Sequence, residues 1–421
     1  MAKLIIEGGK PLRGRVRAGG RKNSAVAVLP AALLCDSPSR LENLPAIDDV
    51  TVYGDILQHL GCKVSAHPSC TGNGAIMVDP GGLQPGEIPY ELTKRLRASY
   101  YLLGVMLARH GAAQVPLPGG CDIGLRPIDQ HLKGLRALGA DVSIEHGVVT
   151  AKARCLTGTS IYLDVVSVGA TINIMLAATL AQGTTVIENA AREPHVVDLA
   201  NYLNAAGARV QGAGTDVIRV RGVNRLNGCA HAIIPDEIEA ATYMIAAAST
   251  GGDVQVDNVI PKHLDPVIAK LQEVGAEVTE EGDSLRVRMS RRPRAVNVKT
   301  LPYPGFPTDA QQPMTVLLSV AEGTSIVTES IWESRFKHVD ELKRMGTNIR
   351  VEGRTAIIEG VAQLTGAPVT ASDLRAGAAL VVAALAAQGE TAISGIELVD
   401  RGYENVSEKL RGMGAEVSRE K

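Results

Sequence analysis

The chain has 421 residues, 45% of them hydrophobic, which is enough for two or three domains with a substantial buried core. Its formal net charge is −2, which excludes a partner bound through overall charge, such as nucleic acid or an anionic membrane surface. No stretch approaches the ~18 apolar residues of a membrane span, and the N-terminus lacks a signal segment, so we expect a cytoplasmic protein without a membrane partner.

In chain order, helical apolar spacing ends six times at a glycine that a strand-like stretch follows at once, as in LGADV and VGAEV. These glycines are Gly61, Gly139, Gly207, Gly275, Gly346 and Gly414, at separations of 78, 68, 68, 71 and 68 residues. Glycine suits the left-handed position just after a helix. The pattern predicts six structural repeats of about 70 residues each.

Two further signals recur between these glycines. Segments rich in small apolar residues, followed by Gly and a β-branched stretch, occupy 172–189, 242–258, 314–330 and 379–394. Small residues on nearly every face predict helices that are buried all round. The pattern G-x-x-x-L-x-G, at 8–14, 222–228 and 360–366, predicts a turn between strands. Each repeat is therefore expected to be βαβαββ; a solenoid scaffold is the alternative, but no standard solenoid period fits.

Polar residues gather where each buried helix is expected to begin. Capping explains Asp236, Thr308 and Asp373. It does not explain Lys22, Arg97 or Arg375, because a cation opposes the positive end of the helix dipole. Backbone N–H groups and cations at several helix starts together predict a strongly anionic ligand.

Five motifs then carry a resemblance: GGRKNSA, LPGGCDIGLRPIDQH, SVGAT, FPTDAQ and DRGYEN, in this order. Over essentially the whole chain they resemble the UDP-N-acetylglucosamine 1-carboxyvinyltransferase family, enolpyruvyl transferases that begin bacterial peptidoglycan synthesis and so serve cell wall biogenesis, cell shape and cell division. The resemblance implies an α/β fold of two inside-out α/β barrels, with three repeats in each and the active site between them. One domain would span 22–232, and the other would combine 1–21 with 233–421.

The resemblance also implies site residues. Lys22, Arg126 and Arg401 match residues that hold phosphoenolpyruvate. Those that match contacts to the UDP-sugar are Asn23, Arg97, Arg126, Pro127, Ile128, Asp129, Gln130, Ser167, Val168, Asp309 and Ile331. Arg335 and Arg375 match arginines of the same site. The catalytic set would be Cys121, Asp309, Lys22 and Arg401.

Cys121 matches the general acid of the family. It follows Gly119 and Gly120 in a segment that also holds Arg126. A thiol of pKa ~8.5 is mostly protonated at neutral pH and serves to protonate C3 of the enol ether. The same thiol matches one that forms a pyruvate-derived adduct and that fosfomycin alkylates. Cys35, Cys62, Cys70, Cys155 and Cys229 lack this context and are expected to be structural free thiols.

Asp309 in FPTD would be the base that deprotonates the sugar hydroxyl or the C3 methyl group of the intermediate, kept ionised by a helix N-terminus. Lysines and arginines are expected to carry the phosphate charge, so neither a metal nor a cofactor is expected.

Val165 stands where several family members have a lysine near the diphosphate, so nucleotide affinity is expected to be lower or supplied from elsewhere. Two other functions are considered: the sister transferase that acts on shikimate 3-phosphate, and a non-catalytic UDP-sugar-binding paralogue. The Cys121 segment argues against the first, and the presence of Lys22, Cys121 and Asp309 argues against the second.

Overall fold

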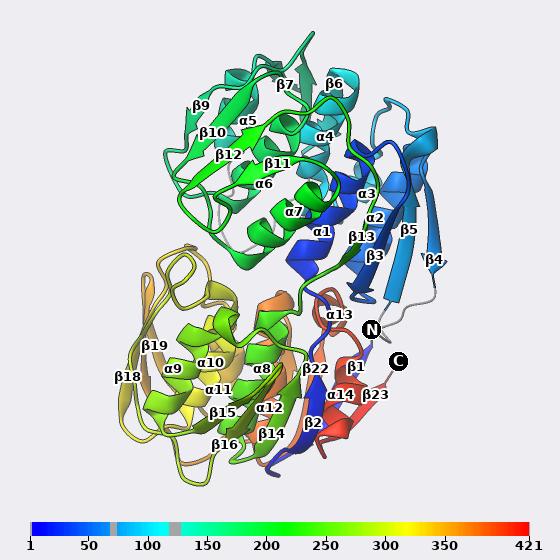
Figure 1. The fold of residues 1–421 in the computed structure, drawn as a ribbon. Helices are drawn as coiled ribbons and strands as arrows, with labels where there is room; N and C mark the ends of the chain where they lie inside the picture. Colours follow the sequence, from blue (N-terminus) through cyan, green and yellow to red (C-terminus); the bar gives the residue numbers. More distant parts are fainter. Residues whose placement is uncertain (1, 68–73, 118–127, 421) are drawn as a thin grey trace. The chain divides into compact units, whose positions relative to one another are not determined.

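The computed structural model describes residues 2–67, 74–117 and 128–420 (Figure 1). The described chain forms two compact units. The first unit runs from Gly20 to Ile234, and the second combines the chain up to Gly19 with the chain from Pro235 onward. These crossing points lie within three residues of the boundaries expected at 22 and 233.

The first unit contains three sheets among its described residues. Their strand orders are β13 (Ala230–Ala232), β3 (Ser39–Leu44), β5 (Gly74–Asp79), β4 (Lys63–His67); β6 (Ala112–Pro116), β8 (Val148–Lys152), β7 (Asp141–Glu145); and β11 (Arg209–Gln211), β12 (Val217–Arg221), β10 (Thr184–Glu188), β9 (Ser160–Tyr162). Its helices are α1 (Lys22–Ala31), α2 (Asp48–His59), α3 (Tyr90–Thr93), α4 (Tyr101–His110), α5 (Asp129–Ala137), α6 (Val168–Ala178) and α7 (Pro194–Ala205), with 3₁₀ turns η1 (Ala32–Leu34), η2 (Pro80–Gly82) and η3 (Arg97–Tyr100).

The second unit repeats this plan. Its sheets have the orders β15 (Glu277–Glu281), β16 (Ser284–Arg288), β14 (Asp253–Asp257), β2 (Arg13–Arg17); β17 (Val298–Lys299), β18 (Thr324–Thr328), β20 (Thr355–Glu359), β19 (Asn348–Glu352); and β21 (Pro368–Thr370), β22 (Gly389–Ser394), β1 (Lys3–Gly8), β23 (Glu416–Glu420). Its helices are α8 (Glu237–Ser249), α9 (Asp265–Val274), α10 (Gln311–Ser319), α11 (Val339–Arg344), α12 (Leu374–Ala386), α13 (Glu397–Asp400) and α14 (Val406–Gly412), with 3₁₀ turns η4 (Pro261–His263) and η5 (Thr308–Ala310).

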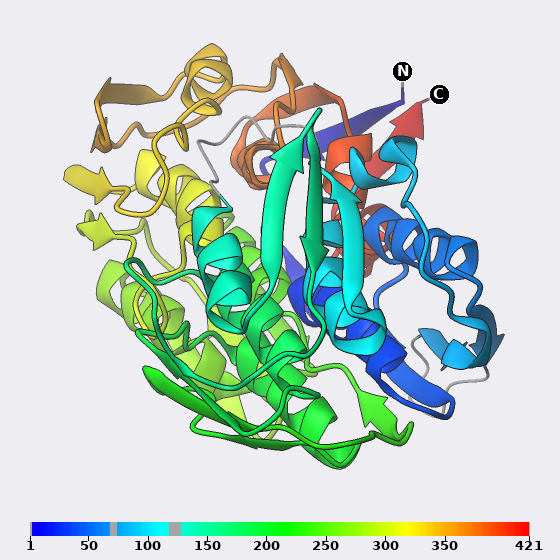
Figure 2. The same ribbon diagram turned by 90° about the horizontal axis from the view of Figure 1, so that it is seen from above.

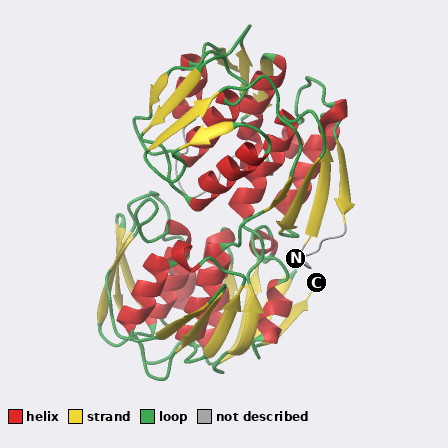
Figure 3. Cartoon of the chain, viewed as in Figure 1, coloured by secondary structure: helices red, strands yellow, loops and turns green. Residues whose placement is uncertain are grey.

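The helices lie inside each unit and the sheets lie outside, which confirms the inside-out α/β fold (Figure 3). In the second unit α8, α10 and α12 pack on one another, and in the first unit α4 packs on α1 and α6. Nearly every residue of α6, α8, α10 and α12 is buried, as their small side chains predict. The six glycines that were expected to end a helix just before a strand all have positive φ, between 84° and 106°.

Within a four-stranded sheet, a short strand lies parallel to its neighbour and the remaining pairs are antiparallel, as in β9–β10–β12–β11. The segments with G-x-x-x-L-x-G link strands of different sheets. The glycines that open two of them are required by space, because a Cβ on Gly222 or Gly360 would lie 1.6 or 1.7 Å from the carbonyl oxygen of Ala181 or Ala321. The leucines of the three G-x-x-x-L-x-G segments, Leu12, Leu226 and Leu364, are buried.

One repeat departs from the expected βαβαββ pattern. Its sheet, β6–β8–β7, has three strands among the described residues, and Figure 2 shows them side by side. Residues 84–89, which precede α4 and its short companion α3, form no strand. Pro85 and Pro89 fall in this segment, and proline cannot donate to a sheet ladder, so we attribute the missing strand to them.

Candidate active site

The predicted site residues fall into three groups. Cys121, Arg126 and Pro127 lie outside the described residues, as does Cys70 among the cysteines expected to be structural. The remaining residues of the expected site belong partly to the first unit and partly to the second, and each group is described within its own unit.

Lys22 and Asn23 are the first two residues of α1. The helix begins after Arg21, whose backbone is extended and whose N–H donates to the Ile234 carbonyl at 2.8 Å. Lys22 Nζ lies 2.8 Å from Asp49 Oδ2, and the two side chains are only 14% and 7% exposed. A carboxylate on the first turn of α2 therefore compensates the lysine charge at the start of α1.

Arg97 begins η3, the 3₁₀ turn that leads into α4, and is half-buried. Two residues earlier, Arg95 donates to both oxygens of Asp48, at 2.8 and 3.1 Å. Asp48 and Asp49 thus hold the Arg97 segment and Lys22 against the same end of α2. Neither aspartate was selected from the sequence, although adjacent acidic residues are a signal for the first turn of a helix.

Ile128, Asp129 and Gln130 lie at the start of α5, where Ile128 is the N-cap residue. The Gln130 amide donates to Asp129 and to Asp164, at 2.8 and 3.1 Å, and accepts from the Asp164 N–H at 3.0 Å. Gln130 is only 6% exposed. The start of α5 is therefore fixed beside the segment that leads into α6.

Ser167 and Val168 mark the start of α6. The Ser167 hydroxyl accepts from the Ala170 N–H at 3.3 Å, and Val168 is the first helical residue. Val165, just before this cap, is 60% exposed. The position where several family members carry a lysine is therefore an exposed aliphatic side chain in this chain.

A buried amide in the middle of α6 contacts α4 and α5. Asn173 on α6 accepts from the Gly104 N–H at 2.7 Å and donates to the Tyr100 carbonyl at 2.9 Å. It also lies 3.0 Å from His131 Nδ1 on α5. Burial lowers the pKa of His131 to about 4, so its ring is neutral at physiological pH. Neither Asn173 nor His131 was selected from the sequence.

In the second unit, Asp309 lies between two arginines. It belongs to η5, which leads into α10. Its Oδ1 accepts from Arg335 and its Oδ2 accepts from Arg375 at 3.1 Å. The arginine side chains are 3% and 7% exposed, whereas Asp309 is 28% exposed. The structure thus brings three predicted residues together, with the carboxylate the most accessible of them.

Arg375 links this carboxylate to the DRGYEN motif. Its second terminal nitrogen donates to the Tyr403 hydroxyl at 3.2 Å, and its guanidinium carbon lies 5.5 Å from the centre of the Tyr403 ring. Burial lowers the pKa of Arg375, but the charge of Asp309 and the other partners outweigh burial and raise it overall. Arg401, two residues before Tyr403, is half-buried at the end of α13.

The buried carboxylate of Glu329, which was not selected from the sequence, contacts the segments that contain Asp309 and Ile331. Glu329, at the end of β18, is 1% exposed. One oxygen accepts from the Thr308 hydroxyl at 2.9 Å, and the other accepts from the Ile331 and Trp332 N–H groups at 2.7 and 3.1 Å. Glu329 therefore positions Ile331 and Thr308, the residue just before Asp309.

Two expectations about the helix starts change. Asp236 and Asp373 cap α8 and α12 as predicted, but Thr308 does not cap a helix, because its hydroxyl donates to Glu329. Lys22 and Arg375 contact carboxylates of the chain itself. Their positive charges are therefore compensated within the chain and do not by themselves require an anionic ligand. Binding of an anion at these helix starts stays a prediction.

The described residues contain neither a metal-binding cluster nor a membrane-spanning helix. No group of three or more His, Cys, Asp or Glu side chains there is arranged to hold a metal ion. No helix in the same part of the chain is long and apolar enough to cross a membrane.

Comparisons with known proteins agree with the resemblance. The sequence pattern of EPSP synthase (3-phosphoshikimate 1-carboxyvinyltransferase) matches residues 6–410. UDP-N-acetylglucosamine 1-carboxyvinyltransferase 3 of Symbiobacterium thermophilum is 59% identical over 421 residues, covering 100% of this chain and 99% of that protein. UDP-N-acetylglucosamine 1-carboxyvinyltransferase of Clostridium botulinum is 57% identical over 420 residues, covering 100% of both chains.

Solved structures share the fold over the whole chain. The enolpyruvyl transferase NikO from Streptomyces tendae matches with a TM-score of 0.88 and 27% identity, covering 99% of this chain and 98% of that one. EPSP synthase from Acinetobacter baumannii matches with a TM-score of 0.77 and 20% identity over 100% of both chains.

Proposed function

The chain belongs to the EPSP synthase family of enolpyruvyl transferases and, within it, to the UDP-N-acetylglucosamine 1-carboxyvinyltransferases; from this premise we propose that it transfers the enolpyruvyl group of phosphoenolpyruvate to the 3′-hydroxyl of UDP-N-acetylglucosamine. Phosphate is the second product. The reaction begins peptidoglycan synthesis, so the protein serves cell wall biogenesis. Both substrates are phosphorylated metabolites, and we propose that the protein meets them in the cytoplasm.

The observation that carries this proposal is the arrangement around Asp309. A carboxylate that accepts a proton during transfer must be accessible and fixed in direction. Asp309 is 28% exposed, and two buried arginines orient it through one oxygen each. Each oxygen has a second lone pair, so the contacts with Arg335 and Arg375 leave room for a proton.

The proposed reaction begins with addition across the double bond of phosphoenolpyruvate. Cys121 donates a proton to C3, and the 3′-oxygen of the sugar forms a bond to C2 as Asp309 takes the hydroxyl proton. The product of this step is a tetrahedral intermediate that still carries the phosphate. Lys22, Arg126 and Arg401 hold the phosphate and carboxylate charges of phosphoenolpyruvate through charge-assisted hydrogen bonds.

Elimination completes the transfer. A proton leaves C3, the bond between C2 and the phosphate oxygen breaks, and the double bond re-forms in the enolpyruvyl ether. Asp309 first gives up the hydroxyl proton, which restores the Cys121 thiol. It is then the proposed acceptor for the C3 proton, which is finally passed to the departing phosphate. No metal, redox cofactor or further reactant is needed to balance these two steps.

We assign the UDP-sugar to residues at four helix starts of the first unit, to Arg126 and Pro127 outside the described residues, and to a segment of the second unit. The residues at the helix starts are Asn23, Arg97, Ile128, Asp129, Gln130, Ser167 and Val168. In the second unit Ile331 and Asp309 complete the set, and Glu329 fixes Ile331 through its N–H group.

Product analysis tests this proposal. The purified chain is incubated with UDP-N-acetylglucosamine and phosphoenolpyruvate labelled with ¹³C at C3, and the sugar nucleotide is examined by mass spectrometry and NMR. We expect a labelled vinyl CH₂ group on the 3′-oxygen and one phosphate for each product molecule. Phosphate release without a labelled sugar nucleotide would contradict the proposal, as would unchanged substrates.

A further inference from the structure

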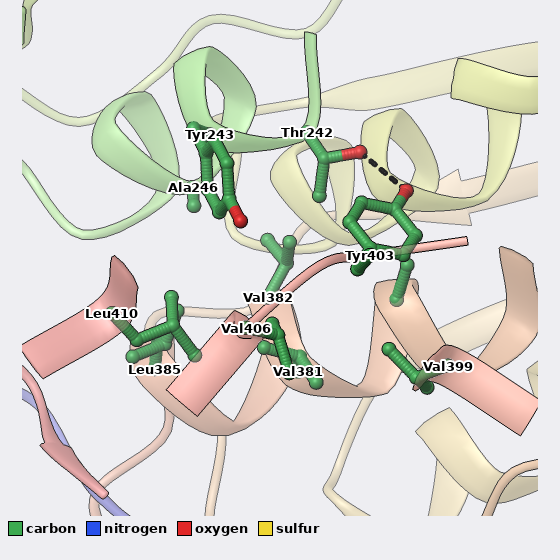
Figure 4. Close-up of a pocket in the computed structure, with 11 residues that line it drawn as sticks. Thr242, Tyr243, Ala246, Val381, Val382, Leu385, Val399, Tyr403, Val406 and Leu410 are labelled. Carbon is green, nitrogen blue, oxygen red and sulfur yellow. Dashed lines mark hydrogen bonds between the residues drawn. The ribbon is translucent and has the colours of Figure 1, made fainter. Parts of the chain in front are cut away.

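Tyr403 is a buried residue of the DRGYEN motif that the proposed reaction does not use. It is 1% exposed, and its hydroxyl lies 3.2 Å from an Arg375 nitrogen and 2.8 Å from Thr242 Oγ1. Figure 4 shows the hydrogen bond between Thr242 and Tyr403. The tyrosine thus joins the arginine that contacts Asp309 to the inner helix α8.

Elementary valence fixes the direction of these hydrogen bonds. A guanidinium only donates, so the Tyr403 oxygen accepts from Arg375 and its own hydrogen goes to Thr242. The Thr242 hydrogen goes to the Ile238 carbonyl at 2.8 Å. Burial raises the pKa of Tyr403, so the phenol keeps the hydrogen that this chain of bonds requires.

The surroundings offer Arg375 no ready replacement for the tyrosine hydroxyl. Tyr403 and residues of α8, α12, α13 and α14 line a void of about 10 Å³, which is at the lower limit for one water molecule (Figure 4). The surface that lines this void is apolar and consists of aliphatic groups and tyrosine rings. Tyr243 lies on the same wall, but its hydroxyl donates to Glu239 at 3.0 Å and takes no part in the contacts of Arg375.

We propose that Tyr403 is a positioning residue for the transfer reaction: its hydroxyl holds the Arg375 guanidinium in the orientation in which it contacts Asp309. This inference rests on the proposed function. Arg375 is fixed at two points, with one terminal nitrogen on Tyr403 and the other on Asp309. Tyr403 is two residues from Arg401, which is proposed to bind phosphoenolpyruvate. The contact between Tyr403 and Arg375 therefore connects the Arg401 segment to Asp309, the proposed base.

Without the phenol oxygen, the nitrogen that faces Tyr403 loses its acceptor, and the apolar lining of the void offers a replacement water few hydrogen-bond partners. The guanidinium is then free to turn toward other carboxylates. Asp236 is one such carboxylate, because its charge already contributes to the raised pKa of Arg375. Asp309 would then keep one of its two arginine contacts, and its orientation would be less defined.

The test compares two buried tyrosines that line the same void. Tyr403→Phe and Tyr243→Phe each remove one hydroxyl and keep the ring. We expect similar decreases in Tm, because both hydroxyls are buried and hydrogen-bonded. We expect kcat for enolpyruvyl transfer to fall about 10–100-fold in Tyr403→Phe and to stay within about twofold in Tyr243→Phe. Equal kcat values for the two variants would overturn the proposal.

The same substitution in an Arg375→Lys protein distinguishes positioning of Arg375 by Tyr403 from a general structural role of Tyr403. In Arg375→Lys, the shorter, unforked side chain cannot hold Tyr403 and Asp309 together. The loss of kcat caused by Tyr403→Phe should therefore disappear in this background, whereas an equal loss in both backgrounds contradicts action through Arg375. If Tyr403→Phe does not fold, Thr242→Val replaces it, with an expected loss of a few fold against Tyr243→Phe. Unmodified protein without transfer activity would refute the proposed function instead.

Discussion

Replacing Asp309 by Asn removes one charge from a cluster of three. In the native chain the carboxylate accepts one hydrogen bond from each of two guanidiniums that are 3% and 7% exposed. An amide of the same shape has one accepting oxygen, and its NH₂ group faces the other arginine. Asp309→Asn therefore leaves two buried cations close together without an anion between them.

The size of the effect follows from these contacts. A hydrogen bond to a charged partner contributes about 1.5–3 kcal/mol. One such bond is lost and the other becomes weaker, while the 28% exposure of Asp309 allows water to compensate in part. We expect a loss of about 2–4 kcal/mol, which in a unit of this size class lowers Tm by about 5–15 °C. Turnover should fall at least about 100-fold, because the proposed base is gone.

Calorimetry on the full chain measures this shift, and Asp253→Asn is the matched control. Asp253 also accepts two guanidinium hydrogen bonds, both 2.8 Å long and from Arg286, but these side chains are 31% and 51% exposed. Exposed pairs contribute about 0.2–1 kcal/mol, so this variant should lose little stability and keep its turnover. Equal Tm values for the two variants, or native turnover in Asp309→Asn, would refute the reasoning.

Three other predictions use different parts of the chain. Lys22→Ala should weaken phosphoenolpyruvate binding by about 10–100-fold, measured by calorimetric titration of the folded variant; native affinity would remove Lys22 from the site. Fosfomycin should alkylate Cys121 faster when UDP-N-acetylglucosamine is present, and Cys121→Asp should block alkylation while keeping some turnover; peptide mass mapping that finds the label on another cysteine would contradict this assignment. The unfolding free energy should fall as pH falls from ~6.5 towards 4, because burial lowers the pKa of His131 and of His338 to about 4 and the unfolded chain binds the additional protons. His338→Gln should flatten that slope in urea titrations, and an unchanged slope would show that His338 does not contribute.

The repeats of the fold were predictable because local backbone requirements recur in the sequence. Gly61 and the five equivalent glycines all adopt the left-handed conformation that ends a helix. The pairing of strands across the two crossing points was not predictable in this way. β2 pairs with β14 and β13 pairs with β3, so each strand joins a sheet whose other strands are distant in sequence.

The sequence selected candidate site residues, whose roles stay predictions, but it did not reveal the contacts that those residues make. Motif resemblance selected Asp309, and Lys22 and Arg375 were selected both by it and as cations at expected helix starts. The contacts that set their charge and direction are made by residues far away in sequence, such as Asp49 for Lys22 and Tyr403 for Arg375. Glu329 gave no signal, because a glutamate at the end of a strand is ordinary until the fold brings four donors to it.

Acceptor choice is the most direct test of the central claim. Phosphate release from phosphoenolpyruvate is measured with the full chain under identical conditions, once with UDP-N-acetylglucosamine and once with shikimate 3-phosphate. We predict rapid release with the sugar nucleotide and no release above background with shikimate 3-phosphate. Release that depends on shikimate 3-phosphate, or no release with either acceptor, would contradict the assignment of this chain as a UDP-N-acetylglucosamine enolpyruvyl transferase.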